Sequence, residues 1–189
     1  LMHSHPMPIK SQSFNLHELL DTVLSFERSS HPGLRFTAYY DASLPDIEAD
    51  RDKLHQVFLN LVRNASEACP ADGRVRVLTR HCAHWELAGT NLDPTRRYIL
   101  VSIEDEGPGI PEELRKNIFK PLFSTKKQGT GLGLSISFRL VESHGGQLRY
   151  QPSERSGACF QVILPESQSE SLEENSPNFV YQDLRKETS

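Results

Sequence analysis

Apolar residues recur at helical spacing in three stretches of the chain. The first stretch follows the helix-capping residue Asn15, and its apolar positions share one face: Leu16, Leu19, Leu20, Val23 and Leu24. The second follows Asp50 and has a broader apolar face: Leu54, Val57, Phe58, Leu61, Val62, Ala65 and Ala68. The third begins near Gly133 and should end at the pair Gly145 and Gly146, because glycine readily adopts the left-handed conformation past a helix end. The pattern therefore predicts three amphipathic helices.

Between these helices, apolar and polar residues alternate with the period of two that is typical of strands. We expect strands at residues 35–40, around Ile47, and at 74–80, 98–104, 147–151 and 158–164. Helices and strands interleave, but several neighbouring strands are joined without a helix. This organisation favours a mixed sheet with helices on one face over a doubly wound parallel sheet.

The two ends of the chain differ from the middle. Residues 1–13 include Pro6 and Pro8 and show little periodicity, so we interpret them as a linker. Residues 166–189 hold six acidic and two basic side chains and few apolar ones, which is typical of a flexible tail. The net charge of the 189 residues is −4, and the tail accounts for all of it. A single domain over residues 14–165 is therefore expected, and the chain without its tail, residues 1–165, carries no net charge.

Composition excludes several classes of function. The mild acidity argues against nucleic acid as the main partner, because phosphate binding needs a clustered basic surface. No apolar run approaches the roughly 18 residues of a membrane span, and no charged-then-apolar leader opens the chain. The three cysteines have no paired spacing, which indicates a reducing compartment, so a cytoplasmic protein is expected. The insertion around His81, Cys82 and His84 matches no standard zinc pattern, and we expect it to be a polar loop.

The second predicted helix carries the first chemical signal. Asn60 and Asn64 are four residues apart at the margin of its apolar face, with Glu67 nearby. Asparagine forms helices poorly, and amide oxygens suit a hard cation such as Mg²⁺. The ordinary alternative is two solvated asparagines on an exposed face, and the spacing alone favours that alternative.

Two glycine-containing segments carry the other signals. Asp105, Gly107, Pro108 and Gly109 follow a predicted strand, so the bend brings a carboxylate to a place where a ligand can approach the backbone. Glycines at 129, 131 and 133 precede the third helix, whose first N–H groups and dipole favour phosphate. The preceding residues 119–128 contain cationic and hydroxyl groups, as expected of a flap over a polyphosphate. The pattern is neither a Walker loop nor a dinucleotide fingerprint.

Together, and in this order, the segments resemble the catalytic, ATP-binding domain of sensor histidine kinases. This domain belongs to a wider family with DNA gyrase, the Hsp90 chaperones and MutL. Residues 56–68 resemble its N box, residues 105–110 its G1 box, residues 118–123 its F box and residues 129–134 its G2 box. The N box and residues 41–46 are similar to those of the nitrogen-regulation (NtrB-like) sensor kinases. The resemblance implies the Bergerat ATP-binding fold, an α+β two-layer sandwich with a mixed, mostly antiparallel sheet and about three helices on one face.

The resemblance also implies roles for individual residues, with ATP and Mg²⁺ as cofactors. Asn64 would coordinate Mg²⁺, Asp105 would accept from the adenine amino group, and Lys126 or Lys127 would contact the γ-phosphate. The catalytic residues would be Asn60, Asn64 and Lys126. The remaining nucleotide-binding positions would be Gly107, Gly109, Ile110, Phe123, Thr125, Gly129, Thr130, Gly131, Leu132, Gly133 and Leu134. Ala158 departs from the family, since many relatives have a threonine there near the adenine.

The expected function is transfer of the γ-phosphoryl group to a histidine outside this chain. In hydrolytic relatives a glutamate occupies the position of Asn60, and an amide cannot act as the base. His17 is followed by glutamate but lacks the Asn-Pro of a phosphoacceptor motif, so the acceptor and dimerisation hairpin are expected upstream of Leu1. The implied partners are that histidine phosphotransfer domain, a response regulator receiver domain and a second copy in a homodimer of the full-length protein. The alternatives are a serine kinase or ATPase on the same scaffold and a non-catalytic nucleotide-sensing module.

Overall fold

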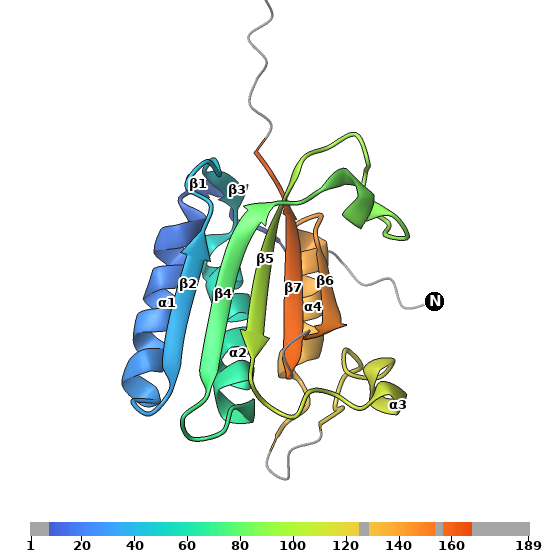
Figure 1. Ribbon diagram of the computed structural model, residues 1–189. Helices are drawn as coiled ribbons and strands as arrows, with labels where there is room; N and C mark the ends of the chain where they lie inside the picture. The colour runs from blue at the N-terminus through green and yellow to red at the C-terminus, as the bar shows by residue number, and fades with distance from the viewer. Residues whose placement is uncertain (1–7, 125–128, 154–156, 168–189) are drawn as a thin grey trace, which may run out of the picture.

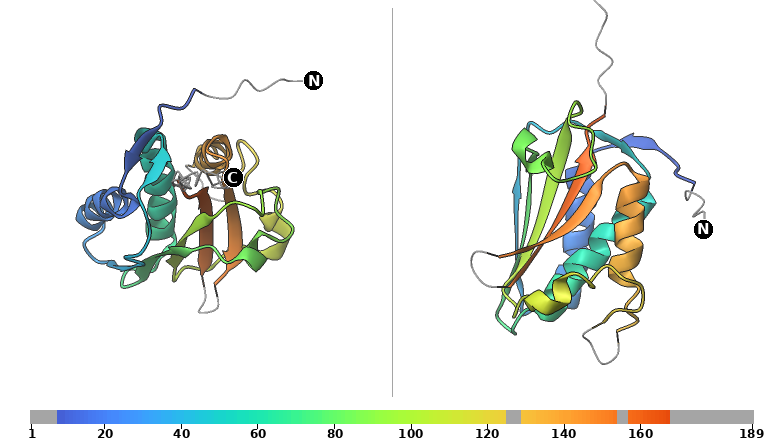
Figure 2. Two further views of the ribbon diagram at one scale, coloured as in Figure 1. Left: turned by 90° about the horizontal axis from the view of Figure 1, so that it is seen from above. Right: turned by 90° about the vertical axis from the view of Figure 1, so that its right-hand side faces the viewer.

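The computed structural model describes residues 8–124, 129–153 and 157–167. One five-stranded sheet runs through it in the order β2–β4–β5–β7–β6, with β2 and β4 parallel and every other neighbouring pair antiparallel (Figure 1). The strands are β2 (Arg35–Tyr40), β4 (Arg74–His81), β5 (Tyr98–Asp105), β6 (Gln147–Pro152) and β7 (Ala158–Pro165). Three helices, α1 (Leu16–Ser30), α2 (Arg51–Ala68) and α4 (Gly133–Ser143), cover one face of this sheet (Figure 2). The predicted α+β sandwich, with a mixed and mostly antiparallel sheet, is confirmed.

The helices begin where their capping residues are. The Asn15 side chain accepts from the backbone N–H of His17 and Glu18, and the Asp50 carboxylate accepts from Lys53 N at the start of α2. The apolar faces that begin there are buried; Leu19, Leu54 and Phe58, for example, have no exposed surface. Helix α2 packs against both α1 and α4, so it lies at the centre of the helical layer. This central position brings the polar margin of α2 next to the start of α4.

A two-stranded sheet joins the beginning of the chain to the start of α2. β1 (Gln12–Phe14) pairs antiparallel with β3 (Ile47–Ala49), and Lys10 N donates to the Asp50 carboxylate at 3.0 Å. Hydrogen bonds from Lys10 and Lys53 lower the pKa of Asp50, because they stabilise its ionised form. The hydrophobic pattern does not predict β1. The segment that leads into the domain is therefore held against the N-terminus of α2.

The insertion after β4 lies over part of the sheet face that carries no helix (Figure 1). It contains the short 3-10 helix η1 (His84–Leu87), and Leu87 joins a second apolar cluster with Tyr98, Leu100 and Ile163. Glu86 is buried, and its carboxylate accepts from Arg80 Nη1 and Nη2 at 2.6 and 2.7 Å. Apart from η1, the described residues of the insertion form no helix or strand, and the buried Glu86 and Leu87 fasten it to the sheet.

The same region holds the histidines and cysteine considered as metal ligands. His81 Nδ1 pairs with Glu166, whereas Cys82 Sγ donates to the backbone of Ala83. Among the described residues, no group of three or more histidine, cysteine or acidic side chains could hold a metal ion. Across residues 8–124, 129–153 and 157–167, no helix is both long enough and apolar enough to cross a membrane.

Candidate functional site: a cavity between α2, β5 and the start of α4

A cavity of about 500 Å³ lies where β5 ends, between the polar margin of α2 and the beginning of α4. The short helix α3 (Glu112–Arg115) follows the bend after β5 beside it. The cavity is lined by Asn60, Asn64, Glu67, Ala68, Asp105, Pro108, Gly109, Ile110, Ile118, Phe123, Ser124, Gly129, Thr130, Gly131, Gly133, Leu134, Ala158 and Phe160. Three segments that are distant in the sequence thus meet in one concave site, which is the usual form of a small-molecule site.

Asp105 is the buried carboxylate of the cavity, with 4% of its surface exposed. Its Oδ1 accepts from Gly107 N at 2.8 Å and from Ala158 N at 3.2 Å. Burial raises the pKa of Asp105, and these two hydrogen bonds oppose the rise. Because both bonds end on Oδ1, the carboxylate is held in one orientation. Its other oxygen is suited to accept from a ligand N–H.

The asparagines of α2 differ in their surroundings. Asn60 Nδ2 donates to Ser137 Oγ of α4 at 3.0 Å, so its amide links the two helices. Asn64 is one turn further along the same side of α2 and lines the cavity together with the exposed Glu67. Amide and carboxylate oxygens are hard donors, and these two are three residues apart on one helix face. This part of the cavity therefore offers a donor set that fits Mg²⁺.

The glycines before α4 allow close approach between segments. Gly131 has φ +67°, and a Cβ there would lie 2.4 Å from the carbonyl carbon of Leu122. Leu122 itself has φ +65°, an uncommon conformation for a residue with a side chain. Gly131 therefore packs directly on the backbone of Leu122, which leads to Phe123. Gly131 and Phe123 both line the cavity.

Two side chains hold the backbone of Ile110, which lines the cavity after the G1-like bend. Ile110 N donates to the Tyr150 hydroxyl at 3.3 Å, and its carbonyl accepts from Arg115 Nε at 3.0 Å. The Arg115 guanidinium lies over the Tyr150 ring, 5.4 Å from its centroid. Both Ile110 backbone groups are thereby satisfied by side chains that themselves contact each other.

Most of the residues singled out in the sequence line this cavity. They are Asn60, Asn64, Asp105, Gly109, Ile110, Phe123, Gly129, Thr130, Gly131, Gly133 and Leu134. Gly107 does not line it but donates to Asp105, and Leu132 lies between two lining residues. Thr125, Lys126 and Lys127 lie outside the described residues. Sequence reasoning gave no role to Glu67 and missed Tyr150, Arg115 and Ser137, whose contacts join distant parts of the chain.

His17 makes its contacts outside this cavity. Its ring stacks on Tyr40 with 4.4 Å between centroids, and its Nε2 is 2.8 Å from Thr79 Oγ1. Burial lowers the pKa of His17, which the nearby Asp21 and Asp41 oppose. These contacts place His17 between α1, β2 and β4, and it does not line the cavity.

Comparison with known proteins gives one family. Residues 49–168 match the family described as "Histidine kinase-, DNA gyrase B-, and HSP90-like ATPase". The catalytic domain of the histidine kinase ThkA is similar in structure, with a TM-score of 0.71 and 33% identity over 83% of this chain and 96% of that one. ThkA in complex with the response regulator TrrA is also similar, with a TM-score of 0.66 and 31% identity over 84% of this chain and 42% of that one.

Two curated relatives of similar sequence are named sensory histidine kinase/phosphatase NtrB. NtrB of Azospirillum brasilense is 37% identical over 86% of this chain and 41% of its own length. NtrB of Rhizobium leguminosarum bv. phaseoli is 37% identical over 92% of this chain and 46% of its own. The chain therefore spans less than half the length of these two relatives.

Proposed function

The chain belongs to the family of histidine kinase-, DNA gyrase B- and HSP90-like ATPases, and on that premise we propose that it binds Mg-ATP for phosphoryl transfer to a protein histidine. The observation that carries this proposal is the shared cavity of Asp105, Asn64 and the glycines before α4. A buried acceptor, a set of hard oxygen donors and a helix N-terminus are the three features that adenine, Mg²⁺ and phosphate require.

Adenine would bind at the buried end of the cavity. The second carboxylate oxygen of Asp105 would accept from the exocyclic amino group, because Oδ1 is already used by Gly107 and Ala158. Ile110, Ile118 and Phe160 line this part of the cavity with apolar surface, as a purine ring needs. Ala158 offers only its backbone there, so recognition of adenine would depend mainly on Asp105.

The phosphates would lie between α2 and the start of α4. Asn64 would hold Mg²⁺ through its amide oxygen, and Glu67 is the next hard donor in the cavity. When bound, Mg²⁺ would neutralise charge on the phosphate oxygens. The first N–H groups of α4, preceded by Gly129 and Gly131, would face the same oxygens. We also propose that Lys126 or Lys127 contacts the γ-phosphate.

Phosphoryl transfer is favoured over hydrolysis by the residue at position 60. The Asn60 amide donates to Ser137 and cannot accept a proton from water. The nucleophile would then come from the acceptor protein, and this domain would supply positioning and charge stabilisation. A serine kinase on this scaffold would use the same cavity, so the acceptor decides between these two functions.

By similarity to NtrB and to ThkA with its response regulator, we extend the proposal to two-component signalling. The acceptor would be a histidine on a dimerisation hairpin in the whole protein, and the phosphoryl group would pass on to a receiver domain. Nitrogen regulation is the signalling role that the NtrB relatives suggest. We propose the cytoplasm as the compartment, in keeping with three cysteines that have no paired spacing.

Calorimetric titration of the chain with ATP, with and without Mg²⁺, tests the nucleotide site. We expect binding that Asp105→Asn weakens at least tenfold, whereas the control Asp93→Asn, in the insertion, leaves affinity unchanged. Equal affinity for both variants would contradict the assignment of Asp105. Label from γ-labelled ATP that appears on a histidine of the acceptor hairpin, as acid-labile and base-stable phosphate, would support the transfer step.

A further inference from the structure

We propose that the helix-free face of the sheet, between β2 and β4, is a docking site for the chain's own acidic segment at residues 168–176. This site lies on the opposite face of the sheet from the helices that carry the nucleotide cavity, and it is independent of the function proposed above. Its occupant would run down the face from the point where β7 ends.

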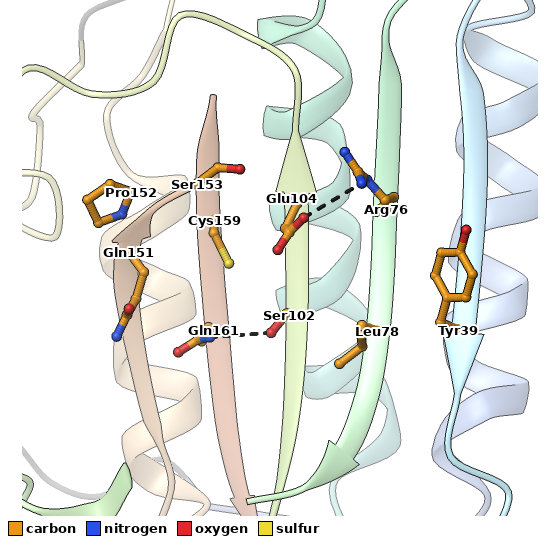
Figure 3. Close-up of a pocket in the computed structure, with 10 residues that line it drawn as sticks. All are labelled: Tyr39, Arg76, Leu78, Ser102, Glu104, Gln151, Pro152, Ser153, Cys159 and Gln161. Carbon is orange, nitrogen blue, oxygen red and sulfur yellow. Dashed lines mark hydrogen bonds and ion pairs between the residues drawn. The ribbon is translucent and has the colours of Figure 1, made fainter. Parts of the chain in front are cut away.

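The surface is a groove of about 390 Å³ that crosses several strands (Figure 3). It is lined by Tyr39, Arg76, Leu78, Ser102, Glu104, Gln151, Pro152, Ser153, Cys159 and Gln161. Tyr39 and Leu78 are 57% and 37% exposed, although both are large apolar side chains. They are partners in the β2–β4 register, so they form one apolar contact area. The insertion after β4 covers a different part of this face, around Leu100 and Ile163.

Next to this apolar area, buried polar atoms have no hydrogen-bond partner among the described residues. They are Thr37 Oγ1, Arg74 Nε and Arg76 Nε. Thr37 pairs with Arg76 in the β2–β4 register, and Arg74 is two residues from Arg76, so all three lie on the same face. A buried polar group without a partner costs free energy, and a carboxylate from outside would satisfy these N–H and O–H donors.

The charge already present on this face leaves room for an acidic ligand. Arg76 has two acidic neighbours, but its ion pairs with Glu104 and Glu106 are long, at 4.0 and 3.6 Å. Arg74 and the adjacent Arg35 form no ion pair with any described residue. Among these residues, Arg35 Nη2 donates only to the backbone carbonyl of Asp72, at 3.3 Å, so neither guanidinium charge is paired with a carboxylate at this corner of the sheet.

The segment that follows Ser167 has the matching chemistry. Residues 168–176 include Glu170, Glu173 and Glu174, one leucine at position 172 and no basic residue. The leucine offers an apolar group for Tyr39 and Leu78, and the glutamates offer carboxylates for the arginines.

The start of the segment is fixed close enough to reach the groove. Glu166 is buried and pairs with His81, the last residue of β4, and with Arg97. From His81, Arg76 and Arg74 lie five and seven residues back along β4, or about 17 and 23 Å. Glu173 and Glu174 lie seven and eight residues beyond Glu166, which is a reach of about 23–28 Å when extended. The lengths of the two paths agree.

A photo-cross-link in the full chain tests this docking. With p-benzoylphenylalanine in place of Leu172, we expect intramolecular cross-links that mass spectrometry maps to β2 and β4, with Tyr39 and Leu78 as the main sites. The combined change Glu170→Gln, Glu173→Gln and Glu174→Gln should lower their yield at least threefold. None of the three glutamates lines the groove, so the variant keeps the groove lining unchanged.

Two further variants separate a specific site from a merely apolar one. Leu78→Ser should reduce the yield as the glutamine changes do, whereas Phe26→Ser, which alters an exposed apolar residue of α1 on the other layer, should not. Cross-links on the helical layer, cross-links between two copies, or a yield that the glutamine changes leave unaltered would each overturn the proposal.

Discussion

Asn60 of α2 lies directly against Gly133, the first residue of α4: a Cβ on Gly133 would be 2.3 Å from Asn60 Oδ1. The same amide donates to Ser137 Oγ one turn further along α4. The distance between the two helices at the phosphate end of the cavity is therefore set by a polar contact together with the absence of a side chain at position 133.

Gly133→Ala should displace the Asn60 amide and break its bond to Ser137. We expect a loss of about 0.5–1.5 kcal/mol in the free energy of unfolding, the net value of one hydrogen bond. Because Ser137→Ala breaks the same bond, the double variant should lose less than the sum of the two single losses in denaturant titrations. Ser143→Ala, on the exposed end of α4, should be additive with Gly133→Ala. Additivity of Ser137→Ala would contradict the coupling.

Gly131→Ala should weaken ligand binding more than Gly133→Ala does. The added Cβ would collide with the backbone of Leu122, which cannot move aside as readily as the Asn60 side chain. Gly89 is a matched control, since its φ is +76° and a Cβ there meets no atom within 4 Å in the described part of the chain. Both substitutions should lower the free energy of unfolding by about 1–2 kcal/mol, because alanine is disfavoured in the left-handed conformation. Only Gly131→Ala should also weaken nucleotide binding, measured by calorimetry. Equal nucleotide affinities in the two variants would show that the Leu122 contact does not shape the cavity.

Asp105→Asn should separate stability from binding. Burial raises the pKa of Asp105, so the folded state binds this proton more tightly than the unfolded state does. The contribution of Asp105 to stability therefore falls as pH rises from the unfolded value of about 3.9 through the raised folded pKa, and above it the ionised group costs stability. At neutral pH the variant should unfold at the same or a higher temperature than the parent chain, yet bind ATP more weakly.

The same shift predicts the pH dependence of binding. Adenine needs the ionised carboxylate, so ATP affinity should begin to fall at a higher pH than for an ordinary aspartate. In Asp105→Asn this part of the pH profile should be absent, because the residue no longer titrates. A profile unchanged by the substitution would contradict the role of Asp105 as acceptor.

Glu86 provides a test of the insertion that does not involve the cavity. Hydrogen bonds from Arg80 lower the pKa of Glu86, and the folded state therefore favours its ionised form. Its stabilisation should be present above the unfolded pKa of about 4.3 and be lost as pH falls through the lower folded pKa. Glu86→Ala removes the carboxylate that accepts from Arg80 and should cost about 1–3 kcal/mol at pH 7, because 38% of the Arg80 side chain is exposed and water can solvate its charge. Glu48→Ala, at an exposed position, is the control, and a similar small loss for both would show that Glu86 does not hold the insertion.

The sequence predicted the three helices and the strands of the main sheet because their apolar periods are long and regular. It missed β1, which has three residues and depends on pairing with β3, more than thirty residues away. Asp105 and Gly131 could be found because they follow local rules for turns and helix starts, and Asn64 because it lies one turn from Asn60 on the same helix face. Tyr150 and Ser137 follow no such rule: they act on Ile110 and Asn60 through contacts that only the folded chain creates.

His17 should not become phosphorylated when the chain is incubated with labelled ATP alone. Its ring is stacked on Tyr40, its Nε2 contacts Thr79, and it does not line the cavity. Peptide mapping after alkaline quenching would locate any phosphohistidine, with His17→Gln as the control. Label on His17 that this control removes would contradict an acceptor outside the chain.

The most direct test of a Mg-ATP site is the affinity of Asn64→Ala for ATP, measured by calorimetry in Mg²⁺ and in EDTA. If Asn64 holds the cation, the substitution should weaken binding at least tenfold in Mg²⁺ and change it little in EDTA. Asn91→Ala, in the insertion, should match the parent chain under both conditions. Asn64→Ala binding Mg-ATP as tightly as the parent chain would contradict the assignment of this cavity.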